Sequence, residues 1–242
     1  MPGHPADHPG PLVFVADLHA PVLTTEDEHH LGRVLRLRAG DALVVGDGAG
    51  RWRPATFGPS LEPTGAVEQA LPPSPPIGVA FGLTKGDKPE LVVQKLTELG
   101  VDRIVPFRAA RSVVQWDEAK ADKATLRWRA VARAAAMQCH RPWLPQVDPV
   151  TELAVVLAER GVALADRGGR PLGLDTPVVV VGPEGGWAPE ERATAARLGV
   201  ASVVVGDHVL RAETAAVTVA ALLAALRAGR VATVPAQPGP AQ

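Results

Sequence analysis

The fold of this chain is decided by the stretch VVVVGPEGGWAPEE, residues 178–191. Four consecutive valines predict a buried strand, and the glycine-rich segment after them predicts a tight turn. Pro189 and the two glutamates that follow predict a helix start, because proline fits the first turn and acids favour the positive end of the helix dipole. Ligands of open α/β sheets bind at the carboxyl ends of strands, so this turn is a candidate ligand loop. A tight turn without a ligand is the alternative.

A second segment of the same kind is VGDHVLRAETAAV, residues 205–217. It follows an expected strand at 201–205 and opens an expected helix at 213–228. Alone it is a weaker signal, because Glu213 and Thr214 could simply cap the helix and Arg211 could simply pair with an acid. Two such loops could lie side by side and form one pocket, since glycines let the backbone approach a ligand and leave N–H donors available.

The chain around these loops alternates between strand and helix patterns. Strands are expected at 77–83, 101–107, 162–165, 178–181 and 201–205, and helices at 89–99, 118–138, 152–160, 189–198 and 213–228. This alternation predicts an α/β fold with a largely parallel sheet that is covered by helices on both faces.

The N-terminal part has a different pattern. Short apolar runs at 12–16, 42–46, 51–57 and 64–69 are separated by turn residues, which predicts a small β-barrel or sandwich. One helix interrupts it, with Thr25 as the expected N-cap and Glu28 in capping-box position. Four prolines between 72 and 76 predict a stiff linker. We therefore expect domains at 1–71 and 77–242, a linker at 72–76 and a loose tail at 235–242.

Composition narrows the class of protein. The chain has 242 residues, 46% of them apolar, and a single cysteine, which predicts a folded protein of a reducing compartment without disulfides. No secretory signal, membrane span or metal site is expected. The net charge is −1, yet residues 103–141 hold nine basic and three acidic side chains. That local excess indicates either a surface for a polyanion or an ordinary solvated helix face.

The two loop motifs together resemble the RsmE family, the uridine N3-methyltransferases of 16S ribosomal RNA. The motifs are GPEGG at 182–186 and VLRAETA at 209–215. Further stretches agree, in the order HLGRVLR at 30–36, KGDK at 85–88, QKLTELGV at 94–101, RSVV at 111–114 and QCHR at 138–141. Three sites depart from the family pattern: Met137 replaces a usual Glu, His140 a common Gly, and Asp207-His208 a common Pro-Arg pair.

The resemblance implies a SPOUT-type trefoil-knotted parallel sheet with helices on both faces, plus a small N-terminal PUA-like β-barrel that binds RNA. It implies S-adenosylmethionine as the cofactor, held largely by backbone atoms of the two loops. The implied cofactor-binding residues are Val181, Gly182, Pro183, Glu184, Gly185, Gly186, Val205, Gly206, Val209, Leu210 and Thr214. It also implies a homodimer through the knot, with the alanine-rich helix at 214–226 as a candidate interface; a plain core helix is the alternative.

The implied substrate is 16S ribosomal RNA or the small ribosomal subunit, in the cytoplasm. Our hypothesis is that Arg211 helps to bind the uridine or to stabilise its developing anion, and that Glu213 accepts a proton. Purely structural roles for both residues are the alternative. Candidate phosphate contacts are Arg33, Arg36, Arg111 and Arg141. Two other readings stay open: a SPOUT enzyme for another ribosomal or transfer RNA site, and a non-catalytic RNA-binding factor of ribosome assembly.

Overall fold

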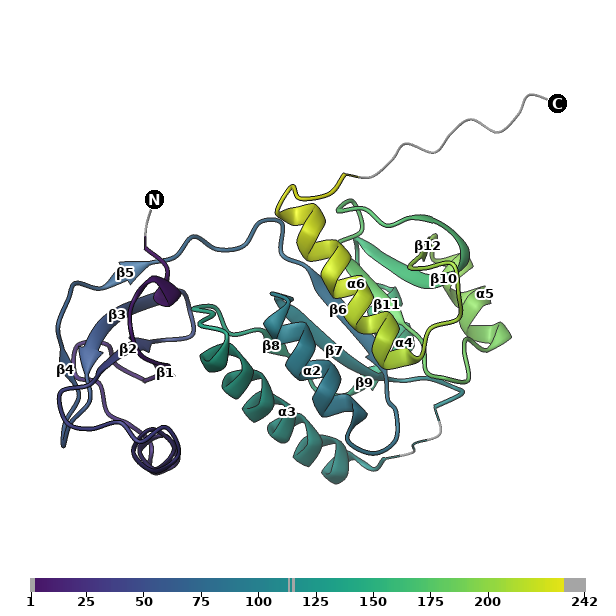
Figure 1. Ribbon diagram of the computed structural model, residues 1–242. Helices are drawn as coiled ribbons and strands as arrows, with labels where there is room; N and C mark the ends of the chain where they lie inside the picture. Colours follow the sequence, from purple (N-terminus) through teal and green to yellow (C-terminus); the bar gives the residue numbers. More distant parts are fainter. Residues whose placement is uncertain (1–2, 113, 115, 233–242) are drawn as a thin grey trace. The chain divides into compact units, whose positions relative to one another are not determined.

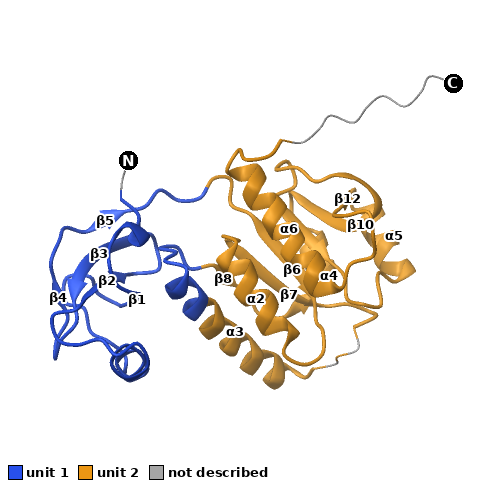
Figure 2. Ribbon diagram, viewed as in Figure 1, with its two compact units in different colours: residues 1–73, 133–144 blue, residues 74–132, 145–242 orange. Residues whose placement is uncertain are grey.

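The computed structural model describes residues 3–112, 114 and 116–232, which form two compact units (Figure 1, Figure 2). Unit 1 contains Met1–Pro73 and Arg133–Leu144; unit 2 contains Ser74–Ala132 and Pro145–Gln242. The division at 1–71, 72–76 and 77–242 stays a prediction about domains. The units add one feature to it, the grouping of 133–144 with the N-terminal segments. Val113 of the RSVV motif and the tail at 235–242 lie outside the described residues.

Unit 1 is built on a five-stranded sheet. β1 (Leu12–Phe14) runs parallel to β2 (Ala42–Gly46), and β2 pairs antiparallel with β3 (Arg51–Thr56). Two short strands complete it by pairing with β3: β4 (Glu62–Pro63) and β5 (Glu68–Gln69). Three helical segments accompany the strands: η1 (Pro5–Asp7), α1 (Thr25–His29) and the π-helical turn η2 (His30–Val34). The small β-rich N-terminal part expected from the sequence is therefore present.

Both faces of this sheet are buried, because alternate side chains of a strand point to opposite sides. Val13, Leu43 and Val45 belong to one apolar cluster. Phe14, Val44 and the fully buried Trp52 belong to another, which also contains Ala136 of the long helix α3 (Glu118–Gln138). The last turns of α3 thus cover a sheet face that the N-terminal segments leave open, which explains why 133–144 belongs to unit 1.

The N-cap of α1 is Thr24, so the expectation of Thr25 with Glu28 is wrong by one residue. Thr24 Oγ1 accepts a hydrogen bond from Asp27 N at 3.1 Å. Asp27 is buried and receives two 2.8 Å hydrogen bonds from the guanidinium of Arg133. Burial opposes ionisation of this carboxyl, but the bonds from Arg133 and Thr24 hold the pKa of Asp27 below its usual value. The contact of Asp27 with the distant Arg133 therefore favours Thr24 as the N-cap, a choice that the local sequence did not settle.

Unit 2 is an α/β structure with an all-parallel sheet. The strand order is β12-β10-β11-β6-β7-β8, and β9 also pairs with β7. The strands are β6 (Gly78–Gly82), β7 (Arg103–Arg108), β8 (Gln146–Val147), β9 (Thr151–Glu152), β10 (Val162–Pro171), β11 (Val178–Val181) and β12 (Ala201–Val204). Neighbouring parallel strands end at the same edge, so the loops that follow β10, β11 and β12 come together.

Helices cover both faces of this sheet. Val79 and Phe81 pack in the cluster that includes residues of α2 (Lys88–Glu98), α3 and α6 (Ala212–Arg227). Ala80, between them, packs with residues of α4 (Leu153–Leu157) and α5 (Pro189–Arg197) on the opposite face. The predicted α/β class, with a parallel sheet and helices on both faces, is confirmed. Most expected element bounds differ from the observed ones by one or two residues.

Two features of unit 2 shape the loops at its carboxyl edge. β12 lies at the edge of the sheet, yet α6 packs on β6, β11 and α2, so the chain crosses back over the strand ends between Val204 and Ala212 (Figure 1). In addition, β10 extends to Pro171 rather than 165, with an irregularity between Ala165 and Arg170 in its pairing with β12.

Candidate active site

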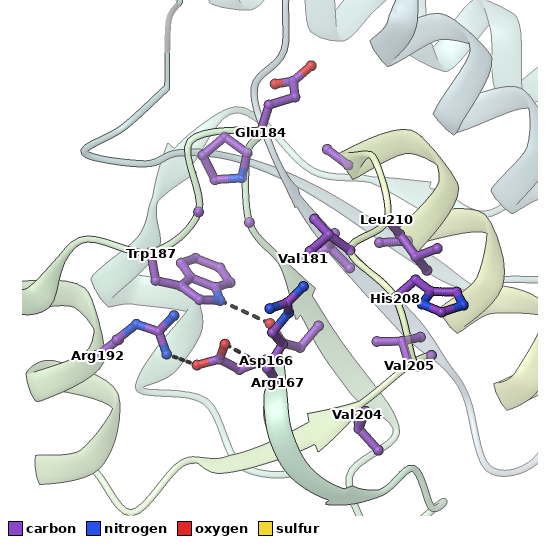
Figure 3. A pocket seen from close by; sticks show the side chains of 18 residues that line it. Asp166, Arg167, Val181, Glu184, Trp187, Arg192, Val204, Val205, His208 and Leu210 are labelled. Carbon is purple, nitrogen blue, oxygen red and sulfur yellow. Dashed lines mark hydrogen bonds and ion pairs between the residues drawn. The ribbon is translucent and has the colours of Figure 1, made fainter.

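A cavity of about 250 Å³ opens where β10, β11 and β12 end (Figure 3). One wall is the loop after β11, and another is the returning segment after β12. Nine of the eleven predicted cofactor residues line it: Val181, Gly182, Pro183, Glu184, Gly186, Val205, Gly206, Val209 and Leu210. The two loops therefore form one pocket, as their sequence suggested. That these residues bind a cofactor stays a prediction.

The other two predicted cofactor residues do not line this cavity. Gly185 faces the segment before α3, since a Cβ on it would lie 3.0 Å from both Cβ and O of Arg111. Thr214 is exposed on the first turn of α6. Gly186 lines the cavity with φ +65°, and a Cβ there would meet nothing within 4 Å. Glycine at 186 therefore allows the positive φ of the backbone, and its missing side chain leaves the adjacent part of the cavity open.

Trp187 fixes the loop after β11 to the sheet. Its indole Nε1 donates to Ala165 O at 2.9 Å, and its ring stacks on Phe107 with centroids 6.2 Å apart. A Cβ on Gly182 would lie 3.1 Å from the same indole ring, a tight contact that glycine avoids where the loop closes over the ring. Sequence reasoning missed Trp187. A large aromatic directly after GPEGG was the available signal, because buried aromatics anchor loops by the area they bury.

The pocket also has a polar wall that the sequence did not reveal. Asp166, Arg167 and Arg192 line it, and Asp166 forms an ion pair with Arg192 from α5. Asp166 lies beyond the expected end of β10 at 165, where pairing with β12 becomes irregular. This geometry depends on contacts between strands that are far apart in sequence, so no local pattern announced these residues.

The first turn of α5 ties a further loop to the site. Glu191 accepts a hydrogen bond from Ala188 N and another from Ala110 N, both at 2.8 Å. Beside it, Arg111 donates from Nη1 to Gly185 O at 3.2 Å. Arg111, a predicted RNA contact, is exposed and touches the loop that forms the pocket.

The predicted catalytic residues flank the pocket without lining it. Arg211 is exposed, and its backbone carbonyl accepts the first bond of α6 from Ala215 N at 2.8 Å. Glu213 lies one residue beyond Ala212, which does line the cavity. Its Oε1 is 3.6 Å from Lys88 Nζ, while its Oε2 is buried and has no hydrogen-bond partner among the described residues.

Lys88 also contacts the pocket-lining Glu184, with Nζ 2.6 Å from Oε1. The hydrogen bond to Glu184 raises the pKa of the Lys88 ammonium above its ordinary value. In return, the bond from Lys88 lowers the pKa of the Glu184 carboxyl. Lys88, Glu184 and Glu213 thus form one charged cluster from three separate segments of unit 2. Sequence reasoning missed Lys88, although it belongs to the KGDK stretch.

The other predicted RNA contacts belong to unit 1. Arg33 and Arg36 are exposed near the end of η2, and Arg141 is half-buried. Arg36 adopts φ +58°, a conformation that few non-glycine residues take. His140 has φ +55°, which explains in physical terms why glycine suits this position in the family pattern. Met137 packs against both apolar clusters of unit 1, where the usual Glu would bury a charge.

The basic segment at 103–141 is less available than its charge suggested. At least four of its nine basic residues pair with acids elsewhere: Arg103 with Asp148 and Glu159, Arg108 with Glu152, Arg127 with Glu90, and Arg133 with Asp27. The bonds to Glu159 and Asp148 raise the pKa of Arg103. The positive charge that this segment offers to a polyanion is therefore smaller than the count of its basic residues suggests.

Neither a metal centre nor a membrane-spanning helix is found in the part of the chain that the structure describes. No three His, Cys, Asp or Glu side chains there are grouped to hold a metal ion. No helix among those residues is long and apolar enough to cross a membrane.

Known families and proteins match both units. An RNA methyltransferase PUA domain matches residues 23–57, and an RNA methyltransferase domain matches residues 72–224. The ribosomal RNA small subunit methyltransferase E of Mycobacterium bovis is 34% identical over 220 residues, covering 81% of this chain and 82% of that protein.

Solved structures agree over nearly the whole chain. A putative methyltransferase from Legionella pneumophila, in complex with S-adenosylmethionine, has a TM-score of 0.79 at 27% identity, covering 90% of this chain and 98% of that one. A ribosomal RNA small subunit methyltransferase E from Neisseria gonorrhoeae, also bound to S-adenosylmethionine, has a TM-score of 0.72 at 26% identity, with the same two coverages. The chain therefore belongs to the ribosomal RNA small subunit methyltransferase E family, RsmE, and combines a PUA-like unit with a SPOUT-type RNA methyltransferase domain.

Proposed function

We propose that this protein transfers a methyl group from S-adenosylmethionine to N3 of a uridine in 16S ribosomal RNA. The observation that carries the proposal is the one pocket built from both family motifs, beside which a Glu213 oxygen has no partner among the residues that the structure describes. The name of the Mycobacterium bovis relative supports a small-subunit ribosomal RNA substrate, and the bound ligand of two solved relatives supports the cofactor. The uridine N3 position follows from the resemblance of the motifs to the RsmE family.

The pocket fits S-adenosylmethionine in its chemistry. Val181, Val205 and Leu210 supply apolar walls for an adenine ring, and the open space beside Gly186 admits a ligand close to the backbone. The carboxylates of Asp166 and Glu184 suit ribose hydroxyls or the cationic groups of the methionine part. Arg167 suits its carboxylate. We assign the binding of the cofactor to these groups and to the loop backbone at 181–186 and 205–210, with Gly185 and Thr214 supporting from outside the cavity.

Bound S-adenosylmethionine supplies a methyl group made electrophilic by its sulfonium, so the protein mainly aligns the reactants and moves a proton. The uridine N3 proton is only weakly acidic and is engaged in base pairs, so the base must be presented unpaired. Glu213 Oε2 accepts that proton in our proposal, because it is a buried acceptor with no partner among the described residues. Exposed Arg211 contacts the uridine or its developing negative charge.

The RNA backbone is contacted by basic side chains in this proposal. In unit 2 the candidate is Arg111, which contacts the loop after β11, and in unit 1 the candidates are Arg33, Arg36 and Arg141. Removing Arg33 and Arg36 together should weaken RNA binding and reduce the slope of log K against log salt by about 2, close to one unit per lost phosphate contact. Replacing Arg103, which pairs with Asp148 and Glu159, is the matched control and should leave the slope unchanged.

We further propose that the protein acts as a homodimer in the cytoplasm, where its substrate is assembled. An apolar groove beside α6 supports the dimer. It is lined by Leu172, Leu222 and Leu226 among others, and it shares Val204, Val205 and Gly206 with the cofactor pocket. The molar mass in solution, measured by light scattering, tests this part separately.

The test begins with calorimetric titration of the purified protein with S-adenosylmethionine. Micromolar binding is expected for the wild type, and loss of binding for Gly182→Val, whose side chain would collide with Trp187. Methylation mapping of small subunits from cells that lack the enzyme then identifies the base. Arg211→Ala should lose turnover and keep cofactor affinity. No binding by a folded protein supports the non-catalytic RNA-binding factor instead, and a methyl group at another site supports the other SPOUT substrates.

A further inference from the structure

A polar site with unused hydrogen-bonding capacity adjoins the pocket. It comprises Lys88 at the start of α2, Glu184 in the loop after β11 and Glu213 in the first turn of α6, and we call it the charged cluster. Figure 3 shows Glu184 pointing away from Asp166 and Arg192, toward the opposite side of its loop. The charged cluster therefore lies at one end of the pocket, where a substrate could meet a bound cofactor.

Glu213 brings an acceptor to this site. Its side chain is only 16% exposed, and its Oε2 is buried with no partner among the described residues. Leaving a buried polar atom unbonded costs free energy, so such an atom is a candidate acceptor for a donor from a ligand. Thr84, in the loop that leads to Lys88, is 4% exposed and its hydroxyl also lacks a partner in the described chain. Two buried acceptors without a described partner thus belong to residues next to Lys88, one in the preceding loop and one in contact with its ammonium group.

Lys88 brings donors to the same site. An ammonium group has three N–H donors, and Glu184 takes one of them at 2.6 Å. Glu213 Oε1, at 3.6 Å, is close enough for charge attraction but too far for a hydrogen bond. Because the Lys88 side chain is 34% exposed, its remaining donors are open to a ligand.

We propose that Lys88 and Glu213 together recognise the imide edge of the target uracil, an inference that rests on the proposed function. Glu213 Oε2 accepts the N3–H, and Lys88 Nζ donates to the adjacent carbonyl oxygen. Uracil presents a donor flanked by acceptors along this edge. Cytosine presents an acceptor at N3 and a donor at N4. Its N3 would face the Glu213 carboxylate as one acceptor against another, and its N4 amino group would face the Lys88 ammonium as one donor against another. Lys88 is therefore a specificity-determining residue that contacts the substrate.

The same pair assists the transfer step. The N3 proton moves to Glu213, the N3 lone pair forms the bond to the methyl carbon, and the electron pair of the broken C–S bond remains on sulfur. As Glu213 becomes neutral, the attraction of Lys88 shifts to the carbonyl oxygen that carries the developing negative charge. Glu213 then returns its proton to water. The sum is N3-methyluridine, S-adenosylhomocysteine and one proton.

The experiment compares Lys88→Met with Lys88→Arg and with Lys85→Met, an exposed control on the same loop. The probes are two RNA fragments that contain the mapped methylation site, one with the natural uridine and one with cytidine there. Their affinities are measured in the presence of S-adenosylhomocysteine, so the readout does not depend on turnover. The rate of uridine methylation is measured against pH in parallel. Thermal melting and titration with S-adenosylmethionine confirm that each variant is folded.

The wild type should bind the uridine fragment at least about 10-fold more tightly than the cytidine fragment, as expected where an unmatched edge leaves buried polar groups unpaired. Lys88→Met should bring this ratio near one and lower kcat/KM about 100-fold, with cofactor affinity within about twofold. Lys88→Arg should recover part of both, because it keeps the charge, and Lys85→Met should resemble the wild type. Lys88→Gln replaces Lys88→Met if the latter does not fold.

Two failures are distinguishable. If the wild type methylates uridine and Lys88→Met keeps the wild-type preference for uridine, Lys88 does not recognise the base. This inference is then overturned, while the proposed function stands. If the wild type binds S-adenosylmethionine but methylates a base other than uridine, the proposed function fails and the imide recognition fails with it.

Discussion

The two ends of the pocket are held in opposite ways. The packed end comprises Ala165, Asp166, Trp187 and Arg192, where the indole donates to a backbone carbonyl and the two charged groups pair with each other (Figure 3). In the charged cluster of Lys88, Glu184 and Glu213, a buried carboxylate oxygen and part of the ammonium donors have no partner within the described part of the chain. An end whose polar groups already have hydrogen-bond partners can hold a ligand in one orientation. An end whose polar groups lack partners gains those hydrogen bonds only when the substrate binds.

The largest expected effect comes from removing the aromatic anchor of the packed end. Trp187→Ala should lower the free energy of unfolding by about 3–5 kcal/mol, because the indole is buried against Phe107 and its removal leaves a cavity. Chemical denaturation measures the loss, and titration with S-adenosylmethionine should show weakened binding. Trp187→Phe is the control. It keeps a ring on Phe107 and gives up the bond to Ala165 O, so about 1 kcal/mol should be lost.

The next effect tests the close packing of the end of β6 against the loop that carries Glu184. A Cβ on Gly82 would lie 2.9 Å from Pro183 Cδ and 3.0 Å from Pro183 N. Gly82→Ala should therefore push the loop away and destabilise the protein by about 1–3 kcal/mol, as overpacking does. Gly32→Ala, whose Cβ would meet nothing nearer than Phe57 at 3.8 Å, is the matched control. Equal melting temperatures for the two variants would mean that the approach of Pro183 is not tight.

The difference between the two ends also explains what the sequence could predict. GPEGG and the second loop are local signals, and nine of the eleven residues expected at a ligand do line the pocket. Asp166 and Arg192 were missed because their pairing depends on the irregular continuation of β10, a contact between distant strands. Lys88 was missed because its partners lie 96 and 125 positions further along the chain. Periodicity reports which face of an element is buried, but it does not report which loops meet.

Unit 1 gives the same lesson at the level of the fold. Its strands were expected from short apolar runs and turn residues, and those near 12–16, 42–46 and 51–57 are present, whereas the run expected at 64–69 is wrong, since only Glu68–Gln69 of it forms a strand. The covering of its second face by Ala136 and the pairing of Asp27 with Arg133 were not expected. Helix α3 was predicted with its observed bounds, yet an isolated helical pattern does not show that its last turns serve another unit.

A smaller effect is expected at the ion pair of the packed end. Asp166→Asn should weaken S-adenosylmethionine binding by about 3- to 10-fold, because a partly buried charge-assisted contact contributes about 1 kcal/mol. Arg192→Gln and the double variant complete a thermodynamic cycle. If Asp166 acts through Arg192, the double variant should be no worse than either single one. Additive losses would support the direct contact with the cofactor that the proposed function assigns to Asp166.

The smallest effect concerns the pH dependence of the charged cluster. Lys88 lowers the folded-state pKa of Glu184 below the ordinary value of 4.5, so their attraction stabilises the fold above that pH and disappears as the pH falls through the lowered pKa. Glu184 in turn raises the pKa of Lys88 above 10.5, so the attraction is fully present below that pH. Glu184→Gln should therefore melt slightly below the wild type from pH 6 to 8 and together with it near pH 3.

Salt should reduce that difference, because both side chains are about one-third exposed and an exposed pair is screened. The Trp187→Phe difference should stay constant over the same range of pH and salt, since it depends on a neutral hydrogen bond and on packing. A melting difference for Glu184→Gln that persists at pH 3 would contradict the electrostatic origin of the contact. In that case the charged cluster would be held by packing, as the packed end is, and the contrast between the two ends would be lost.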